Sequence, residues 1–262
     1  MTNNPNIEAA AKRLRKAAET RVVCSPVRDL IDEYDEELAY KVQQINNDLR
    51  IKAGERVVGK KIGLTSKSVQ AQFGISAPDF GLLFDTNEVL NGSEISIAEI
   101  MQPRVETEIA FILGKDLIDP SITAAEMLSA IDFALASIEI VGSRIKNWDI
   151  RITDTIADNA SASHFVLGHK PVHLSNFDLI NCKMAMQKNG EVVSEGKGSD
   201  CIGSPINAAI WLARKMTTLG DPLKAGDILL TGALGPMVPV DAGDHVSATI
   251  EGLGEVSVTF TD

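Results

Sequence analysis

Two glutamates stand one residue apart inside a segment, Pro103 to Phe111, that otherwise has the pattern of a strand entering a hydrophobic core. Alternate side chains of an extended segment share one face, so the carboxylates of Glu106 and Glu108 point the same way, with their Cα atoms about 6.6 Å apart. The pair can therefore converge on one cation. It can also line the solvent face of an edge strand, and the spacing alone leaves both interpretations open.

A third acid, Glu139, lies in the run Ala134 to Val141, where every neighbour is apolar or small. A buried carboxylate needs a partner, because burying an unpaired charge is costly. At an effective dielectric of about 20, two like charges about 4 Å apart repel by roughly 4 kcal/mol, so three clustered carboxylates require protonation or a cation. A divalent metal ion would balance all three. The alternative is that Glu139 pairs with Arg104 or Arg144.

The chain changes character after Gly54. Residues 7–18 and 35–52 are rich in strong helix formers, which predicts two N-terminal helices. The sequence beyond them consists of short β-rich runs separated by glycine and proline, a pattern typical of a β-dominated domain. We therefore expect a helical segment over residues 1–55 and a β-rich catalytic domain over residues 56–262.

Two further helices and several strands are predicted within the β-rich part. One helix should run from Thr123 to about Ser137, with Thr123 as N-cap and Glu126 three residues later in a capping box. Another should begin at Ser204, a natural N-cap followed by proline, and end at Leu219 before a glycine. The C-terminal strands are expected at residues 227–231, 245–250 and 256–260.

Composition excludes several classes of protein. A chain of 262 residues with 44% hydrophobic residues can bury a large core, and no apolar run approaches the roughly 18 residues that span a bilayer. A formal charge of -11 disfavours nucleic acid and anionic membranes as partners, since both need clustered cations. Three widely spaced cysteines without a C-x-x-C motif indicate reduced thiols. The N-terminus lacks the pattern of a signal peptide, so a cytoplasmic location is expected.

Two lysines and an aspartate are candidates for proton transfer. Adjacent residues of a strand face opposite ways, so at most one of Lys60 and Lys61 can enter a pocket lined by their segment. Asp79 follows a proline in a turn-like segment and either forms an Asx-type turn or acts as a general acid or base. The loops at residues 158–161 and 231–236 are small and polar, and their backbone N–H groups can approach an oxyanion closely.

Six short motifs follow one another along nearly the whole chain, and together they are far more specific than any one alone. They are Lys61–Thr65 (KIGLT), Pro78–Gly81 (PDFG), Gln102–Glu108 (QPRVETE), Glu139–Arg144 (EIVGSR), Asp154–Ser161 (DTIADNAS) and Thr231–Met237 (TGALGPM). In this set the chain closely resembles the 2-hydroxypenta-2,4-dienoate (2-keto-4-pentenoate) hydratases of aromatic meta-cleavage pathways, within the fumarylacetoacetate hydrolase-like group. The resemblance implies an α+β fold, a mixed β-roll like the fumarylacetoacetate hydrolase C-terminal domain, with an N-terminal helical segment.

The resemblance also implies roles for individual residues. The three glutamates Glu106, Glu108 and Glu139 would bind Mg²⁺ or Mn²⁺, leaving open positions for the carboxylate and C2 oxygen of a small anionic 2-hydroxy-dienoate. Lys61 and Asp79 would transfer protons, with Lys60 as the fallback if the strand faces the other way. The implied substrate contacts are Leu83, Asn159, Ser161 and Gly232.

The implied reaction is hydration, in which the ionised dienol becomes a 2-oxo-enoate and water adds at C4 to give 4-hydroxy-2-oxopentanoate. The 4-oxalocrotonate decarboxylases of the same family are the alternative, but they tend to carry Tyr-Gly in place of Asp79-Phe80-Gly81, and the acid present here favours hydration. The related hydrolases use an early histidine, whereas the first histidine here is His164. A non-catalytic scaffold would gain nothing from clustered acids. The resemblance further implies a homo-oligomer, pentameric or decameric, and association with the downstream aldolase.

Overall fold

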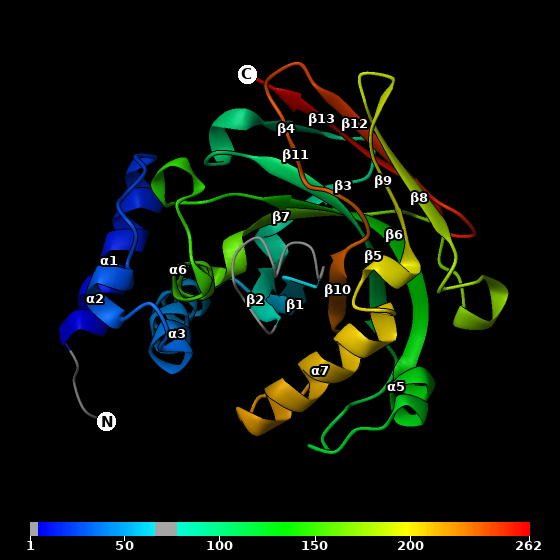
Figure 1. The fold of residues 1–262 in the computed structure, drawn as a ribbon, viewed down its shortest axis with the longest axis horizontal. Helices are drawn as coiled ribbons and strands as arrows, with labels where there is room; N and C mark the ends of the chain where they lie inside the picture. Colours follow the sequence, from blue (N-terminus) through cyan, green and yellow to red (C-terminus); the bar gives the residue numbers. More distant parts are fainter. Residues whose placement is uncertain (1–4, 66–77) are drawn as a thin grey trace.

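Two mixed β-sheets organise the computed structural model of the chain, which describes residues 5–65 and 78–262 (Figure 1). The strands of the larger sheet are β1 (Val57–Gly63), β2 (Asp79–Phe84), β3 (Glu88–Leu90), β5 (Arg104–Leu113), β6 (Ile131–Val141), β7 (Ala162–Leu167), β10 (Ile228–Ala233) and β11 (Val238–Pro239). They follow the order β2-β1-β10-β5-β6-β7-β3, with β11 paired to β5. The β1/β10 and β3/β7 pairs are parallel, and the other pairs are antiparallel.

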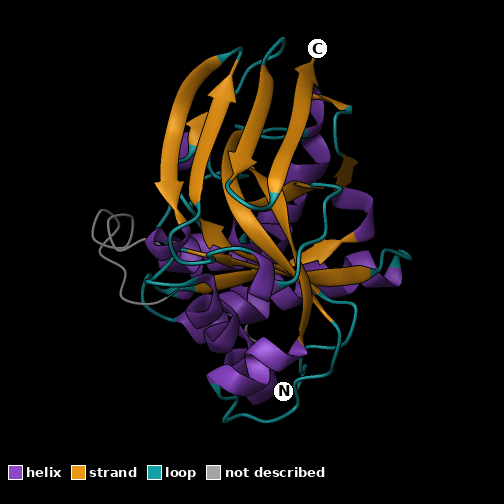
Figure 2. Cartoon of the chain, turned by 90° about the vertical axis from the view of Figure 1, so that its right-hand side faces the viewer, coloured by secondary structure: helices purple, strands orange, loops and turns teal. Residues whose placement is uncertain are grey.

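The second sheet has the order β4-β13-β12-β8-β9 and lies at the opposite end of the molecule from the N-terminal helices (Figure 2). Its strands are β4 (Glu94–Ser96), β8 (Lys183–Lys188), β9 (Glu191–Lys197), β12 (His245–Ile250) and β13 (Gly254–Thr261). The parallel β13/β4 pair makes this sheet mixed as well. Two mixed sheets combined with α-helices confirm the expected α+β class.

Three helices precede the first strand: α1 (Pro5–Thr20), α2 (Arg28–Ile31) and α3 (Glu36–Lys52). The first and last of these are the two helices predicted from composition. They form a hydrophobic cluster of their own, in which Leu14 and Val42 pack near Ile156 of α6 (Ile152–Ala157). The helical segment thus rests against α6 and the loop that follows it, while the division at residues 55 and 56 stays a prediction.

The prediction of a helix from Thr123 to about Ser137 is wrong over its second half. The capping box between Thr123 and Glu126 is present and starts α5 (Ala124–Ala130), but β6 begins at Ile131. The segment from Ile131 onward pairs with β5 on one side and β7 on the other. This pairing on both edges outweighs the local helix preference of the alanine-rich stretch. The helix predicted from Ser204 is confirmed as α7 (Pro205–Thr218), capped by the Ser204 hydroxyl.

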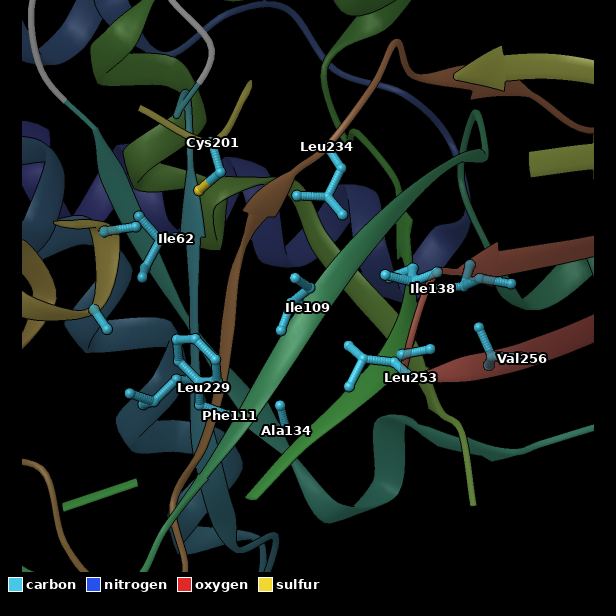
Figure 3. Packing of buried hydrophobic residues seen from close by; sticks show 14 of the residues in the cluster. Ile62, Ile109, Phe111, Ala134, Ile138, Cys201, Leu229, Leu234, Leu253 and Val256 are labelled. Atoms are coloured by element: carbon cyan, nitrogen blue, oxygen red, sulfur yellow. The ribbon is translucent and has the colours of Figure 1, made fainter. Parts of the chain in front are cut away.

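The two faces of the larger sheet differ in character. On one face Ile109, Phe111 and Leu229 join Leu253 and Val256 in the main hydrophobic core (Figure 3). The opposite face of the same sheet carries the acidic residues and a smaller apolar cluster, made of Leu83, Ala110, Leu135, Phe165 and Leu230. The period of two along β5 therefore separates packing from chemistry.

All three cysteines are free thiols, as the sequence predicted. None of the described helices is long and apolar enough to cross a membrane.

Candidate metal centre and its buried lysine

Three glutamates meet on β5 and β6. The antiparallel pairing places Glu106 directly opposite Glu139 and Glu108 opposite Ser137. One carboxylate oxygen from each glutamate lies within 4.8 Å of the others. Because β5 lies inside the sheet, between β10 and β6, Glu106 and Glu108 do not line the solvent face of an edge strand.

Burial and mutual repulsion favour the protonated form of each glutamate in the absence of a cation. Glu139 and Glu108 are fully buried, and Glu106 is partly exposed. Burial, followed by the negative charge of Glu139, raises the pKa of Glu106 to about 7. The pKa of Glu108 is raised well above its ordinary value by burial and then by Glu139 and Glu106. Burial also raises the pKa of Glu139, against the lowering effect of Lys61.

Several oxygens of this cluster lack hydrogen-bond donors among the described residues. Glu108 Oε2 accepts the backbone N–H of Gly232 at 2.8 Å, but Glu108 Oε1 and Glu139 Oε2 have no hydrogen-bond partner there. Buried polar atoms are rarely left in this state. Three convergent carboxylates with free lone pairs match the oxygen ligands that hard divalent cations prefer. The residues present therefore fit a divalent metal ion.

Lys61 reaches this cluster from β1. Its Nζ lies 3.1 Å from Glu139 Oε1 and donates a hydrogen bond to the carbonyl of Ala160 at 2.9 Å. At 3.1 Å the ammonium group and the Glu139 carboxylate form a buried ion pair. Burial alone would lower the pKa of Lys61, but the surrounding carboxylates, led by Glu139 and Asp79, outweigh it and raise the pKa.

Lys60, the fallback for the proton-transfer role, does not face the glutamates. Lys60 is as buried as Lys61 but faces the other side of β1, where its Nζ pairs with Asp227 Oδ2 at 3.0 Å. Adjacent strand residues point to opposite faces, so the structure brings only Lys61 to the glutamates. The alternative partners considered for Glu139 are engaged elsewhere, since Arg144 pairs with Asp158 and Arg104 stacks over Trp148.

Asp79 opens β2 beside Lys61. It lies opposite Gly63 of β1, where a Cβ would meet Asp79 Oδ1 at 2.2 Å, so the glycine provides the space for this carboxyl group. Asp79 Oδ2 accepts a hydrogen bond from the Thr155 hydroxyl at 3.3 Å, whereas Oδ1 has no partner among the described residues. Burial raises the pKa of Asp79, while Lys61 opposes the shift. Sequence reasoning missed Thr155, because its contact with a residue 76 positions away leaves no local signal.

The four residues predicted to contact the substrate differ from one another in what surrounds them in the structure. Leu83 lies on the glutamate-bearing face but packs into the small apolar cluster described above. Gly232 directs its N–H at Glu108 and has φ +108, and a Cβ there would meet Thr65 Oγ1 at 2.0 Å. Ser161 Oγ lies 3.4 Å from Thr155 Oγ1. The Asn159 side chain contacts the backbone of Leu82 in β2.

Comparison with known proteins identifies close relatives. Residues 61–261 match the family model of the fumarylacetoacetate (FAA) hydrolase C-terminal domain. The chain is 50% identical to a 2-keto-4-pentenoate hydratase from Paraburkholderia phymatum, over 100% of both chains. It is 42% identical to a 2-hydroxyhexa-2,4-dienoate hydratase from Comamonas testosteroni, again over 100% of both chains.

A solved structure shares the whole fold. The 4-oxalocrotonate decarboxylase from Pseudomonas putida, complexed with magnesium and adipate, superimposes with a TM-score of 0.94 and 30% sequence identity. The match covers 99% of this chain and 98% of that chain. A divalent cation in this relative agrees with the donor set that the three glutamates form here.

Proposed function

The chain belongs to the fumarylacetoacetate hydrolase family and, within it, to the 2-keto-4-pentenoate hydratases, and on this premise we propose that it hydrates 2-hydroxypenta-2,4-dienoate to 4-hydroxy-2-oxopentanoate. The observation that carries the proposal is the buried glutamate cluster with Lys61 and Asp79 on the same face of one sheet. The chain is 50% identical in sequence to a hydratase over its full length and carries Asp79, and both observations favour water addition over other reactions of this fold.

Glu106, Glu108 and Glu139 hold the cation in this proposal, and Mg²⁺ or Mn²⁺ suits their oxygen donors. When bound, the cation supplies Lewis-acid polarisation of the substrate's oxygens. The charge of the lysine matters as well, because three carboxylates repel an anionic substrate. A divalent ion and the Lys61 ammonium together neutralise those carboxylates, so the substrate's own carboxylate can enter the site.

Two proton movements are required. In the first, the 2-hydroxyl group loses a proton and C5 gains one, which converts the dienol into a conjugated 2-oxo-3-enoate. In the second, water adds to C4 as C3 takes up a proton. Burial raises the pKa of Asp79 while Lys61 opposes the shift, so Asp79 suits the exchange of protons with the substrate. The raised pKa of Lys61 keeps it an ammonium, which suits it to stabilise the oxygen that loses its proton and to return a proton there later. Lys60 has no part in this scheme.

The substrate contacts proposed are the backbone around Gly232 and the hydroxyl of Ser161. Leu83 belongs to the apolar cluster beyond the glutamates, where it would shape the space for the hydrocarbon end of the substrate. We further propose a homo-oligomer, pentameric or decameric, associated with the downstream aldolase. Light scattering of the protein alone and with the aldolase tests both. The cytoplasmic location stays a prediction.

A product assay tests the reaction. Freshly generated 2-hydroxypenta-2,4-dienoate is mixed with the protein and Mg²⁺ or Mn²⁺, and the dienoate absorbance and the products are followed. We expect metal-dependent loss of absorbance with formation of the 4-hydroxy-2-oxo acid. Oxalocrotonate serves as the comparison substrate. Carbon dioxide release from it, without hydration of the pentadienoate, would assign the chain to the decarboxylases instead.

A further inference from the structure

We infer that Asn159 is a positioning residue, which clamps a left-handed turn at residues 159–161 onto β2 and thereby holds Lys61 and Asp79 in their relative places. The inference rests on the proposed function, because it assigns the two held groups to proton transfer. It also replaces the substrate contact expected for Asn159 from the sequence.

The turn has an unfavourable backbone. Asn159, Ala160 and Ser161 have φ values of 54°, 51° and 58°, so three consecutive residues with side chains lie in the left-handed region. Residues other than glycine visit this region singly, because their Cβ approaches the following carbonyl group. Such a conformation persists only where surrounding contacts enforce it, and these residues cluster at functional sites.

The Asn159 side chain provides that enforcement. Its Oδ1 accepts the backbone N–H of Leu82 at 2.9 Å, and its Nδ2 donates to the Leu82 carbonyl at 3.0 Å. Asn47 of α3 donates a further hydrogen bond to the same Oδ1 at 3.2 Å. The amide thus pairs with a strand backbone as a neighbouring strand would, which leaves its oxygen fully engaged.

The backbone of the turn also packs tightly on β2. A Cβ at Gly81 would meet the Asn159 carbonyl oxygen at 2.2 Å, so only glycine allows this approach. This contact gives a physical reason for the glycine of the PDFG motif. Both the clamp and the close approach join the turn to the strand that begins with Asp79.

The turn contacts Lys61 directly and is linked to Asp79 through Thr155. The Ala160 carbonyl accepts the hydrogen bond from Lys61 Nζ at 2.9 Å. The Ser161 hydroxyl lies 3.4 Å from the Thr155 hydroxyl, which in turn donates to Asp79. A shift of the turn would therefore move the lysine and the aspartate together.

Asn159 and Asn47 line a cleft of about 450 Å³ between α1, α3 and the start of β7. The lining of this cleft contains neither Lys61 nor Asp79, and none of the three glutamates. This placement supports a scaffold role over direct contact with the substrate.

Kinetics of matched asparagine variants test the inference. Asn159→Ala should lower kcat by at least 30-fold, and Asn47→Ala, which removes one contact, by 3- to 10-fold. KM and the Mg²⁺ concentration for half-maximal activity should each stay within threefold. Asn46→Ala is the control, because Asn46 neighbours Asn47 on α3 but bonds to the Ala11 carbonyl instead. Its kcat should stay within twofold of the wild type.

Amide hydrogen exchange gives a readout that does not depend on the reaction. The peptide containing Leu82 should exchange faster in Asn159→Ala than in the wild type or Asn46→Ala. A 10-fold rise in KM with unchanged kcat would make Asn159 a substrate contact and overturn the inference. Unchanged kcat and unchanged exchange would also overturn it, and if Asn159→Ala does not fold, Asn47→Ala carries the same test. A wild-type protein that hydrates nothing refutes the proposed function, while the exchange data still decide whether the clamp exists.

Discussion

Lys61 Nζ lies 3.1 Å from Oε1 of Glu139, in a contact that excludes solvent and links β1 to the strand carrying the third glutamate. The same ammonium group donates to the Ala160 carbonyl. Glu139 therefore serves two purposes, as part of the carboxylate cluster and as the counter-charge of a buried lysine. Removing either partner leaves the other buried and unpaired, which is costly.

The two adjacent lysines should separate activity from stability. Lys61→Met is expected to lower kcat by at least about 100-fold, because it removes the ammonium group beside the glutamates. Lys60→Met should keep kcat within threefold but lower the free energy of unfolding by roughly 1–3 kcal/mol, since Asp227 loses its ion pair and keeps only the backbone N–H of Lys224. Steady-state kinetics and urea unfolding of both variants are the measurements. The reverse pattern would show that Lys60 serves the site.

Glu139→Gln tests the metal role of the cluster while keeping its shape. The amide weakens a cation site, so calorimetry should show at least about 10-fold weaker binding of Mg²⁺ or Mn²⁺, and activity should fall below one hundredth. Glu106→Ala should behave likewise, as a folded protein without metal-dependent activity. Full activity in either variant would remove that glutamate from the site.

The metal-free protein should lose stability as the pH rises from 6.5 to 8. Glu106, Glu108 and Glu139 have raised pKa values in the folded state, about 7 for Glu106, so the folded chain binds more protons than the unfolded chain in this window. His164, whose pKa burial lowers to about 4, contributes only below its ordinary value of 6.5.

Thermal unfolding in EDTA is the measurement, and the Tm is expected to fall by roughly 2–6 °C across this range. With saturating Mg²⁺ the trend should flatten or reverse, because the bound ion takes the place of the protons. A Tm in EDTA that rises with pH would contradict the repulsion inferred for the cluster.

Asp79→Asn should impair proton transfer and spare the metal. The amide preserves the volume of the carboxyl group beside Gly63 but cannot donate an acidic proton. We expect kcat to fall by at least about 100-fold, with the affinity for Mg²⁺ within threefold of the wild type. An unchanged pH–rate profile would count against the assignment of Asp79.

Gly81→Ala should disturb the left-handed turn. The new Cβ would overlap the Asn159 carbonyl, so we expect a loss of roughly 1–3 kcal/mol in stability and a lower kcat. Gly92→Ala is the matched control, since φ +78 makes it strained while its Cβ would meet nothing within 4 Å. The control should lose stability and keep kcat. Equal kcat in both variants would mean that the turn has no influence on the reaction.

Local patterns predicted the starts of elements better than their ends. The capping box at Thr123 and the Ser204 cap each begin a helix where expected, because a cap is a contact between residues three apart or fewer. The end of the first helix could not be read locally. The alanine-rich segment after Ala130 becomes a strand only because β5 and β7 are available on both sides.

The spacing of Glu106 and Glu108 was enough to predict that they share a face, since the period of a strand is two, and the apolar residues around them predicted a core. Only the fold places Glu139 opposite Glu106, because the register between β5 and β6 joins residues 33 positions apart. It also decided which lysine enters the site and how the backbone of residues 159–161 is held. These depend on the orientation of β1 in the sheet and on contacts between segments distant in the chain, neither of which leaves a periodic signal.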